Sequence, residues 1–296
     1  MNKQIKLSIV KVLKYFAIFT YDPTLEEIYT FLPVKISKDE LKKELKRMKY
    51  TPVEYSILSQ KLKPKVKNSN ETMKQWNNLI DRQQISKKKL NSIRFKLYIK
   101  LVSFFPQIKL IGLSGSISMM NADMDDDIDL FIITTRNRLF TGRLIALILA
   151  QLFGLRRSRG VGNNSNKICL NLFFDEVNMK VPRFKQTEFV GHEVLQMKPI
   201  INKEMTYERF LASNKWVFKL FPNSKQIFNF QFSLPRRQAG IFNEKLGDWI
   251  ESNLKSFQMK SINKHKTTEI ITSTQLWFHP DDFEKKLPHL DKADSI

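Results

Sequence analysis

The chain has 296 residues, of which 42% are hydrophobic and 11% aromatic, so it can bury a core and is not globally disordered. Its single cysteine, Cys169, excludes an intramolecular disulfide and is consistent with a cytoplasmic location. A formal net charge of +21 indicates either a polyanionic partner or a solvated Lys-rich surface.

Residues 1–68 predict a winged-helix-like segment. Apolar residues at helical spacing predict a first helix over 7–19. Thr24 and Ser37 each precede a Glu by three residues, which is the capping-box pattern, and therefore predict the starts of two more helices. Alternating residues 53–58 predict a strand.

The third of these helices is strongly basic, and residues 1–100 carry 23 Lys and Arg against nine Asp and Glu. The basic side chains on this helix are Lys42, Lys43, Lys46 and Arg47. Two interpretations remain open: nucleic-acid binding through this N-terminal region, or a docking module that contacts only protein.

The middle of the chain predicts a helical connection followed by an α/β unit. Residues 61–70 read as a polar linker, and 71–106 as one connecting helix that ends at a proline. Within 107–178 we expect strands at 108–113, 127–134 and 168–174, with a short helix after the first and a long apolar helix over 138–155 after the second. The apolar stretch in that long helix is well short of the ~20 residues that span a bilayer, so we expect no membrane partner.

Residues 179–296 predict a mostly helical region, with two helices within 188–221 and another within 241–264. The expected fold class is therefore α/β (α+β). It combines a mixed sheet with flanking helices, the N-terminal winged-helix-like segment and a helical C-terminal region.

Aspartates are unusually dense just before the second expected strand. Five fall within seven residues, namely Asp123, Asp125, Asp126, Asp127 and Asp129. Like charges repel, so this crowding requires a compensating positive charge. A plain acidic turn and an EF-hand calcium loop are alternatives to a catalytic metal site. Thr134 stands where an EF-hand would have its twelfth-position Glu, which argues against the calcium loop.

Gly115-Ser116, ten residues, and Asp127-Ile-Asp129 at the head of an apolar strand resemble the signature of the DNA polymerase beta-like nucleotidyltransferase superfamily. The similarity covers about residues 108–176. It is closest in pattern to small bacterial nucleotidyltransferase-domain proteins that carry an N-terminal winged-helix-like segment. The resemblance implies a minimal nucleotidyltransferase domain and an enzyme that moves a nucleoside monophosphate from a nucleoside triphosphate to an unknown acceptor, with release of pyrophosphate.

The residue chemistry agrees with this resemblance. Asp127 and Asp129 are two apart on a strand, so both project from one face and can hold Mg²⁺ or Mn²⁺. Gly115 has no Cβ and lets the backbone approach a phosphate closely. The hydroxyls of Ser114 and Ser116 can add donors to a triphosphate.

The third carboxylate that active members of the superfamily usually place on a neighbouring strand is not evident. By register its position is Asn171, whose carbonyl oxygen can bind a metal but carries no charge. Asp175 lies ~13 Å further along the strand, and Glu176 faces the other way. The alternative function is therefore a catalytically weak or inactive regulatory protein that binds nucleotide or nucleic acid.

Other candidates have two possible roles each. Three arginines after the second strand either contact phosphate or begin a surface helix: Arg136, Arg138 and Arg143. The pair His192-Glu193 and the lone His279 are expected to be surface or core residues rather than metal ligands. Cys169 lies among apolar residues on a strand and is expected in the core.

Overall fold

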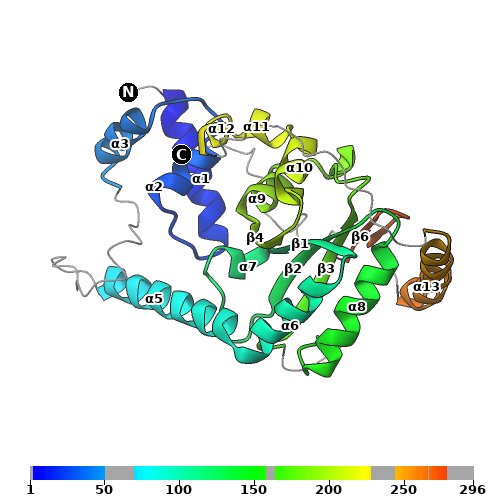
Figure 1. Ribbon diagram of the computed structural model, residues 1–296. Helices are drawn as coiled ribbons and strands as arrows, with labels where there is room; N and C mark the ends of the chain where they lie inside the picture. The colour runs from blue at the N-terminus through cyan, green and yellow to red at the C-terminus, as the bar shows by residue number, and fades with distance from the viewer. Residues whose placement is uncertain (1–2, 51–69, 158–163, 228–243, 266, 279–296) are drawn as a thin grey trace.

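The computed structural model describes residues 3–50, 70–157, 164–227, 244–265 and 267–278 (Figure 1). Within these ranges the chain is a mixed α/β fold with a six-stranded sheet that has helices packed on both faces. No helix in the described ranges has the length and apolar character needed to cross a membrane.

The sheet has the strand order β4-β1-β2-β3-β6-β5. Its strands are β1 (Ile108–Leu113), β2 (Ile128–Thr134), β3 (Ile168–Asp175), β4 (Lys198–Asn202), β5 (Ile270–Ile271) and β6 (Gln275–Trp277). β2 and β3 are parallel, and the other neighbours are antiparallel. The three strands expected from the sequence are confirmed as β1, β2 and β3. Their apolar runs favour central strands, which are buried on both faces.

One face of the sheet is covered by α6 (Ile93–Phe104) and α8 (Leu139–Leu152), with α13 (Glu244–His265) beside α8 (Figure 1). α8 is the expected apolar helix, and it forms the crossover between the parallel strands β2 and β3. A short helix, α7 (Gly115–Ser118), follows β1. The expected order of strand, helix, strand, helix, strand is therefore confirmed.

The single helix expected over 71–106 is wrong, because α5 (Asn70–Asn91) and α6 are separate helices. Ser92 between them has φ −56° and ψ 130°, outside the helical region. Asn and Ser bond readily to nearby backbone and are poor helix formers, which explains a break at this Asn-Ser pair. The break lets α6 pack on α8 while α5 runs elsewhere, toward the acidic loop.

The three expected N-terminal helices are confirmed as α1 (Lys3–Ile18), α2 (Leu25–Phe31) and α3 (Lys38–Arg47). Thr24 and Glu27 form a complete capping box, and Ser37 accepts a hydrogen bond from the backbone N–H of Glu40. The strand expected at 53–58 and nearly all of the expected linker at 61–70 lie outside the described residues.

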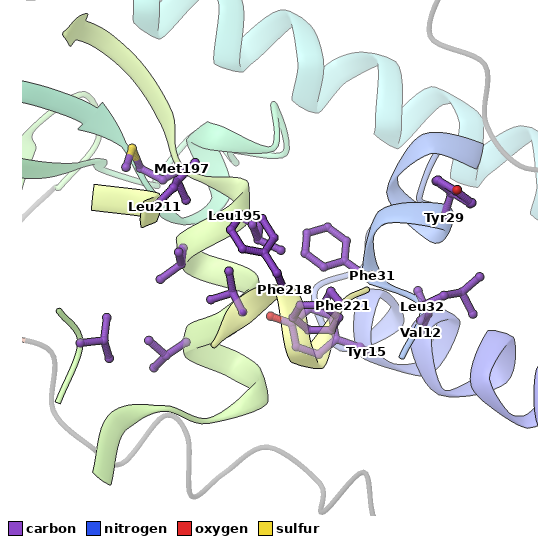
Figure 2. Packing of buried hydrophobic residues seen from close by; sticks show 14 of the residues in the cluster. Val12, Tyr15, Tyr29, Phe31, Leu32, Leu195, Met197, Leu211, Phe218 and Phe221 are labelled. Carbon is purple, nitrogen blue, oxygen red and sulfur yellow. The ribbon is translucent and has the colours of Figure 1, made fainter. Parts of the chain in front are cut away.

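The second face of the sheet is covered by the N-terminal helices together with α9 (Glu188–Gln196), α10 (Thr206–Ser213) and α11 (Val217–Leu220). The ring of His192 stacks on Tyr15 at a centroid distance of 3.6 Å and on Phe31 at 4.2 Å. Figure 2 shows side chains of α1 and α2 facing those of the later helices, among them Phe221. The first and last parts of the chain therefore share one hydrophobic core.

The region 179–296 contributes more β-structure than expected. Two helices were expected within 188–221, and the structure has α9, α10 and α11 with the strand β4 between the first two. β5 and β6 extend the other side of the sheet. The remaining short helices are a 3₁₀ turn at Arg183–Lys185 and α12 (Ser224–Ile227), and the helix expected within 241–264 is confirmed as α13.

Candidate functional site

The acid pair lies where β2 begins. Asp127 immediately precedes this strand, Asp129 is its second residue, and Asp129 lies opposite Cys169 in the parallel register of β3. One carboxylate oxygen of each aspartate and the Cys169 Sγ lie within 4.8 Å of one another. The sequence prediction that these two carboxylates converge is consistent with this geometry, and Cys169, which is buried as expected, lies directly beside them.

The Gly-Ser turn lies against this pair. Gly115 has φ +61°, and a Cβ placed there would lie 2.6 Å from Asp129 Oδ2. The backbone N–H of Ser114 donates to the carbonyl of Asp129 at 3.1 Å. Only glycine accommodates both the left-handed backbone and the close carboxylate of Asp129, whereas the expected close approach to a phosphate stays a prediction.

Asp126, another of the five crowded aspartates, is part of the same arrangement. Its Oδ2 accepts hydrogen bonds from the Ser116 hydroxyl and from the Asp123 backbone N–H, both at 2.9 Å. Ser116 is therefore hydrogen-bonded to the acidic loop, and its hydroxyl donates to a protein carboxylate and not to a ligand.

Cations of α5 compensate the acidic loop from one side. Arg82 donates to the Asp123 carboxylate at 3.0 Å. The ammonium of Lys89, which is 3% exposed, donates to the carbonyl of Met124 at 2.9 Å and to that of Asp126. Burial lowers the pKa of Lys89, and the neighbouring aspartates oppose that shift. Part of the charge compensation that the sequence requires thus comes from the protein itself.

Arg157 supplies another cation beside the acid pair. It donates to Asp127 Oδ2 at 2.7 Å and lies 3.2 Å from Cys169 Sγ. The sequence analysis gave this residue no role, because three arginines occur between residues 156 and 159 and nothing distinguishes one from the next. Its position after α8 and before β3 brings it back to the start of β2.

Asn171 contacts the pair through its amide nitrogen. Its Nδ2 donates to Asp129 Oδ1, while its Oδ1 accepts a hydrogen bond from the Cys169 thiol. The side chain is 8% exposed, so this arrangement is well enclosed. Asn171 was predicted to bind metal through its oxygen; in the structure the nitrogen, and not the oxygen, faces Asp129.

A third carboxylate comes from α9 instead of a neighbouring strand. Glu193 accepts a hydrogen bond from the Gly115 backbone N–H, and its charge acts on Asp129. Sequence reasoning noted His192-Glu193 but treated both as surface or core residues. That is right for His192, which is 1% exposed among aromatic rings. The available signal for Glu193 was an acid directly before the apolar residues Val194 and Leu195 of α9.

These carboxylates have unusual proton affinities. Burial, followed by the charges of Asp127 and Glu193, raises the pKa of Asp129 to about 7, while Arg157 and Asn171 act in the opposite direction. Burial likewise raises the pKa of Glu193 to about 7. Burial and the two aspartates raise the pKa of the Cys169 thiol far above its usual range. Without a cation, the site therefore holds protons near neutral pH.

The predicted phosphate-binding arginines lie elsewhere. Arg136 and Arg143 follow the far end of β2, whose last residue, Thr134, is five residues beyond Asp129, or roughly 17 Å at the rise of a strand. The Arg136 backbone N–H donates to Glu176 at 3.1 Å, and Arg143 donates to Gln258 at 2.6 Å. The structure therefore does not bring these two to the acid pair.

Two further residues weighed from the sequence also lie at this far end. Asp175 accepts the backbone N–H groups of Asn137 and Val177. Arg138 donates to Asp248 at 2.6 Å. These contacts fix the loop after β2 and the start of α8, so their role in the structure is local and distant from the acid pair.

A cavity of about 700 Å³ opens at the acid pair. One end is polar and is formed by the Ser114–Ser116 turn, Asp126, Asp129 and Glu193. The remaining wall is largely apolar and comes from α1, α9 and the second face of the sheet. Such a combination of apolar walls with a few convergent polar groups is typical of small-molecule sites.

The donor set fits a hard divalent cation. Asp127 and Asp129 present carboxylate oxygens on one side, and such oxygens are the ligands that Mg²⁺ and Mn²⁺ prefer. Burial and the charges of Asp127 and Glu193 raise the pKa of Asp129 to about 7 even with Arg157 beside the pair, so a further positive charge would favour its ionised form. A cation bound there would be held by Asp127 and Asp129.

Comparisons with known proteins give no relative. No family model matches the chain, and neither does any curated protein or any solved structure. The chemistry of this site must therefore be inferred from its own residues.

Proposed function

We propose that the protein is a metal-dependent nucleotidyltransferase, an enzyme that transfers a nucleoside monophosphate from a nucleoside triphosphate to an acceptor. One observation carries the proposal: carboxylate oxygens of Asp127 and Asp129 lie within 4.8 Å of each other, and Asp129 lines a cavity together with the Gly-Ser turn. The resemblance of the Gly115-Ser116 and Asp127-x-Asp129 pattern to the polymerase beta-like superfamily supports the same reaction.

In the proposed reaction, an acceptor oxygen or nitrogen forms a bond to the α-phosphorus, the bond from that phosphorus to the bridging oxygen breaks, and pyrophosphate leaves. The acceptor proton passes to a carboxylate of the site. Mg²⁺ or Mn²⁺ held by Asp127 and Asp129 would neutralise charge on the phosphates. The Ser114 hydroxyl would orient the triphosphate, and Arg157, which donates to Asp127, would contact its phosphates.

The first experiment is thermal unfolding with and without ATP and Mg²⁺ on the wild type, Asp127→Asn and Asp129→Asn. A ligand that binds only the folded state raises the melting temperature by mass action. We expect the melting temperature to rise most when nucleotide and metal are both present, and to rise only in the wild type. Equal behaviour of wild type and variants at saturating ligand would reject the proposal. Pyrophosphate release then tests turnover.

A second candidate is a nucleotide-binding regulatory protein with little or no turnover. It is favoured by one observation: Asn171 presents a neutral amide at the position where a strand carboxylate was sought, and its nitrogen faces Asp129. This candidate predicts metal-dependent nucleotide binding without pyrophosphate release. Turnover in the wild type would dismiss it.

Nucleic acid remains a proposed partner of the N-terminal region. All four basic side chains predicted on the third helix are exposed on α3: Lys42, Lys43, Lys46 and Arg47. Two of them have acidic neighbours on the same helix, since Lys42 approaches Asp39 and Arg47 contacts Glu44. Binding of a mixed-sequence RNA should weaken steeply with salt and weaken further in Lys43→Ala/Lys46→Ala. Salt-insensitive or absent binding would reject this partner.

A further inference from the structure

The cavity has two chemically different ends. Its polar end lies at Gly115, Asp129 and Glu193, and its deeper walls carry aromatic and aliphatic side chains from α1, α9 and the sheet. We infer that the acceptor of the proposed transfer is an apolar molecule that ends in a hydroxyl or amino group. Its apolar body would lie in the cavity and its polar end at Glu193. This inference rests on the proposed function and adds the substrate class.

The walls favour the acceptor over the nucleotide. Phe131 and Phe174 line the sheet side and pack edge-to-face at 5.1 Å, and Trp277 stands next to Phe174 at 5.2 Å. Arg82 and Lys185 also line the cavity, but Arg82 is paired with Asp123, and a triphosphate would lose its hydration among the aromatic groups. The phosphates therefore belong outside, near Arg157, while an apolar molecule gains stability by burial.

The N-terminal segment forms part of this wall. Phe16 and Phe19 of α1 and its following turn line the cavity, and Asn121 of the acidic loop donates from its Nδ2 to the carbonyl of Phe19 at 3.0 Å. The end of α1 is thus fixed to the loop that carries the acid cluster. The segment expected to bind nucleic acid therefore also shapes the pocket beside the acid pair.

The polar end sets the chemistry of the reacting group. Glu193 and Asp129 are hydrogen-bond acceptors when ionised, and the turn N–H of Gly115 already donates to Glu193. A hydroxyl or amine can donate to these carboxylates, whereas a carboxylate ligand would meet like charge. At about 700 Å³ the cavity is within the range of sites for drug-sized ligands.

The test uses the full chain without metal or nucleotide and 1-aminoanthracene as a fluorescent probe. It is run at pH 8.5, where Asp129 and Glu193, whose pKa values are about 7, are ionised. We expect the probe to bind, and 1-decanol and decylamine to displace it at concentrations at least tenfold below those needed for decanoate. ATP with Mg²⁺ should not displace it, because the nucleotide occupies the outer side.

Two variants localise the binding. Val194→Phe should fill the cavity and weaken probe binding at least tenfold, because Val194 lines the cavity. Val177→Phe is the matched control, since Val177 is 47% exposed on the turn after β3 and should leave binding unchanged. If Val194→Phe unfolds, Phe189→Ala serves instead. Phe189 is half-buried in the cavity wall, and its removal should improve displacement by 1-tetradecanol relative to 1-decanol at least threefold.

The outcomes separate this inference from the proposed function. Absent probe binding, or binding that Val194→Phe and Phe189→Ala leave unchanged, would overturn the apolar acceptor even if ATP and Mg²⁺ raise the melting temperature. Displacement of the probe by ATP with Mg²⁺ would also overturn it, since the cavity would then hold the nucleobase. Equal displacement by decanoate and decanol would overturn the assigned end group. Probe binding without any effect of ATP and Mg²⁺ would reject the transferase proposal alone and leave the ligand class of the cavity in place.

Discussion

The backbone of Gly115 and the carboxylate of Asp129 lie so close that a single methyl group does not fit between them. A Cβ on Gly115 would lie 2.6 Å from Asp129 Oδ2, and the glycine has φ +61°. The turn therefore packs directly on β2, and the position of Asp129 depends on the absence of a side chain at residue 115, fourteen residues earlier.

Gly115→Ala should act both through the left-handed backbone and through the clash with Asp129. We expect a loss of about 1–2 kcal/mol in the free energy of unfolding from the left-handed backbone, and in addition a loss of metal-dependent nucleotide binding, because Asp129 must move. Gly154→Ala is the matched control: Gly154 has φ +63° with nothing within 4 Å of an added Cβ. Gly154→Ala should lose stability, measured by urea unfolding, and keep its nucleotide binding, measured by calorimetric titration. Equal nucleotide binding in the two variants would contradict the expectation.

Glu193→Gln should change how stability depends on pH. The folded-state pKa of Glu193 is about 7, above its ordinary 4.5, mainly because of burial. The stability that its proton contributes is fully present below pH 4.5 and lost as the pH rises through 7. The free energy of unfolding of Glu193→Gln should therefore exceed that of the wild type by on the order of 3 kcal/mol at pH 8, and the two should be nearly equal at pH 4.5.

The readout for this prediction is the difference between the two proteins in urea unfolding across pH 4.5 to 8. Buried His192 acts in the opposite direction, since burial lowers its pKa and its contribution is lost at low pH. The absolute curve therefore mixes both groups, whereas the difference isolates Glu193. Glu40→Gln, at an exposed position on α3, should give an almost flat difference. A flat difference for Glu193→Gln would show that its carboxylate is well solvated.

Asn171→Asp should make the site depend more strongly on metal. The new carboxylate would face Asp129 in a position that is 8% exposed, so we expect the metal-free protein to lose ~2 kcal/mol of stability. Mg²⁺ should restore it, and the rise in melting temperature with Mg²⁺ should exceed that of the wild type. Asn178→Asp, at an exposed turn residue, is the control. An unchanged Mg²⁺ response would count against Asn171 as the position of the third ligand.

Arg157→Ala should strengthen binding of a metal without nucleotide. Arg157 donates to Asp127 at 2.7 Å and competes with a cation for this carboxylate. The pair is partly exposed, so its removal should raise Mn²⁺ affinity by a modest factor of about two to five. Titration followed by the electron paramagnetic resonance of free Mn²⁺ measures this. Arg156→Ala, one residue earlier and exposed, should leave the affinity unchanged. A weaker affinity in Arg157→Ala would mean that the arginine organises the site.

Much of the central sheet was predictable because its signals are local. The runs at Ile108–Leu113 and Ile128–Thr134 are apolar and rich in β-branched residues, and both strands are found there. β4 was missed because Lys198–Asn202 is short, contains Pro199 and forms a largely exposed edge, so that tertiary pairing and not local propensity makes it a strand.

The site, too, has residues that a local sequence pattern predicts and residues that only tertiary packing brings in. Asp127 and Asp129 are neighbours in sequence, so their convergence follows from strand geometry. Glu193 and Arg157 reach the pair through the packing of α9 and the crossover from α8 to β3, and no local pattern encodes such contacts. Arg136 and Arg143 show the converse, because residues that follow the acid pair in sequence are carried away along the strand.

The hydrophobic core that the N-terminal helices share with α9, α10 and α11 has a consequence for biosynthesis. The Ile36 backbone N–H donates to Asn223 Oδ1 across 187 residues, and Asn223 returns a hydrogen bond to the carbonyl of Val34. At ~5–20 residues per second of translation, the N-terminal helices wait roughly 10–40 s for these partners. During that interval the rings of Tyr15 and Phe31, which later stack on His192, lack these contacts and stay exposed to solvent. The nascent chain is therefore a candidate client for chaperones.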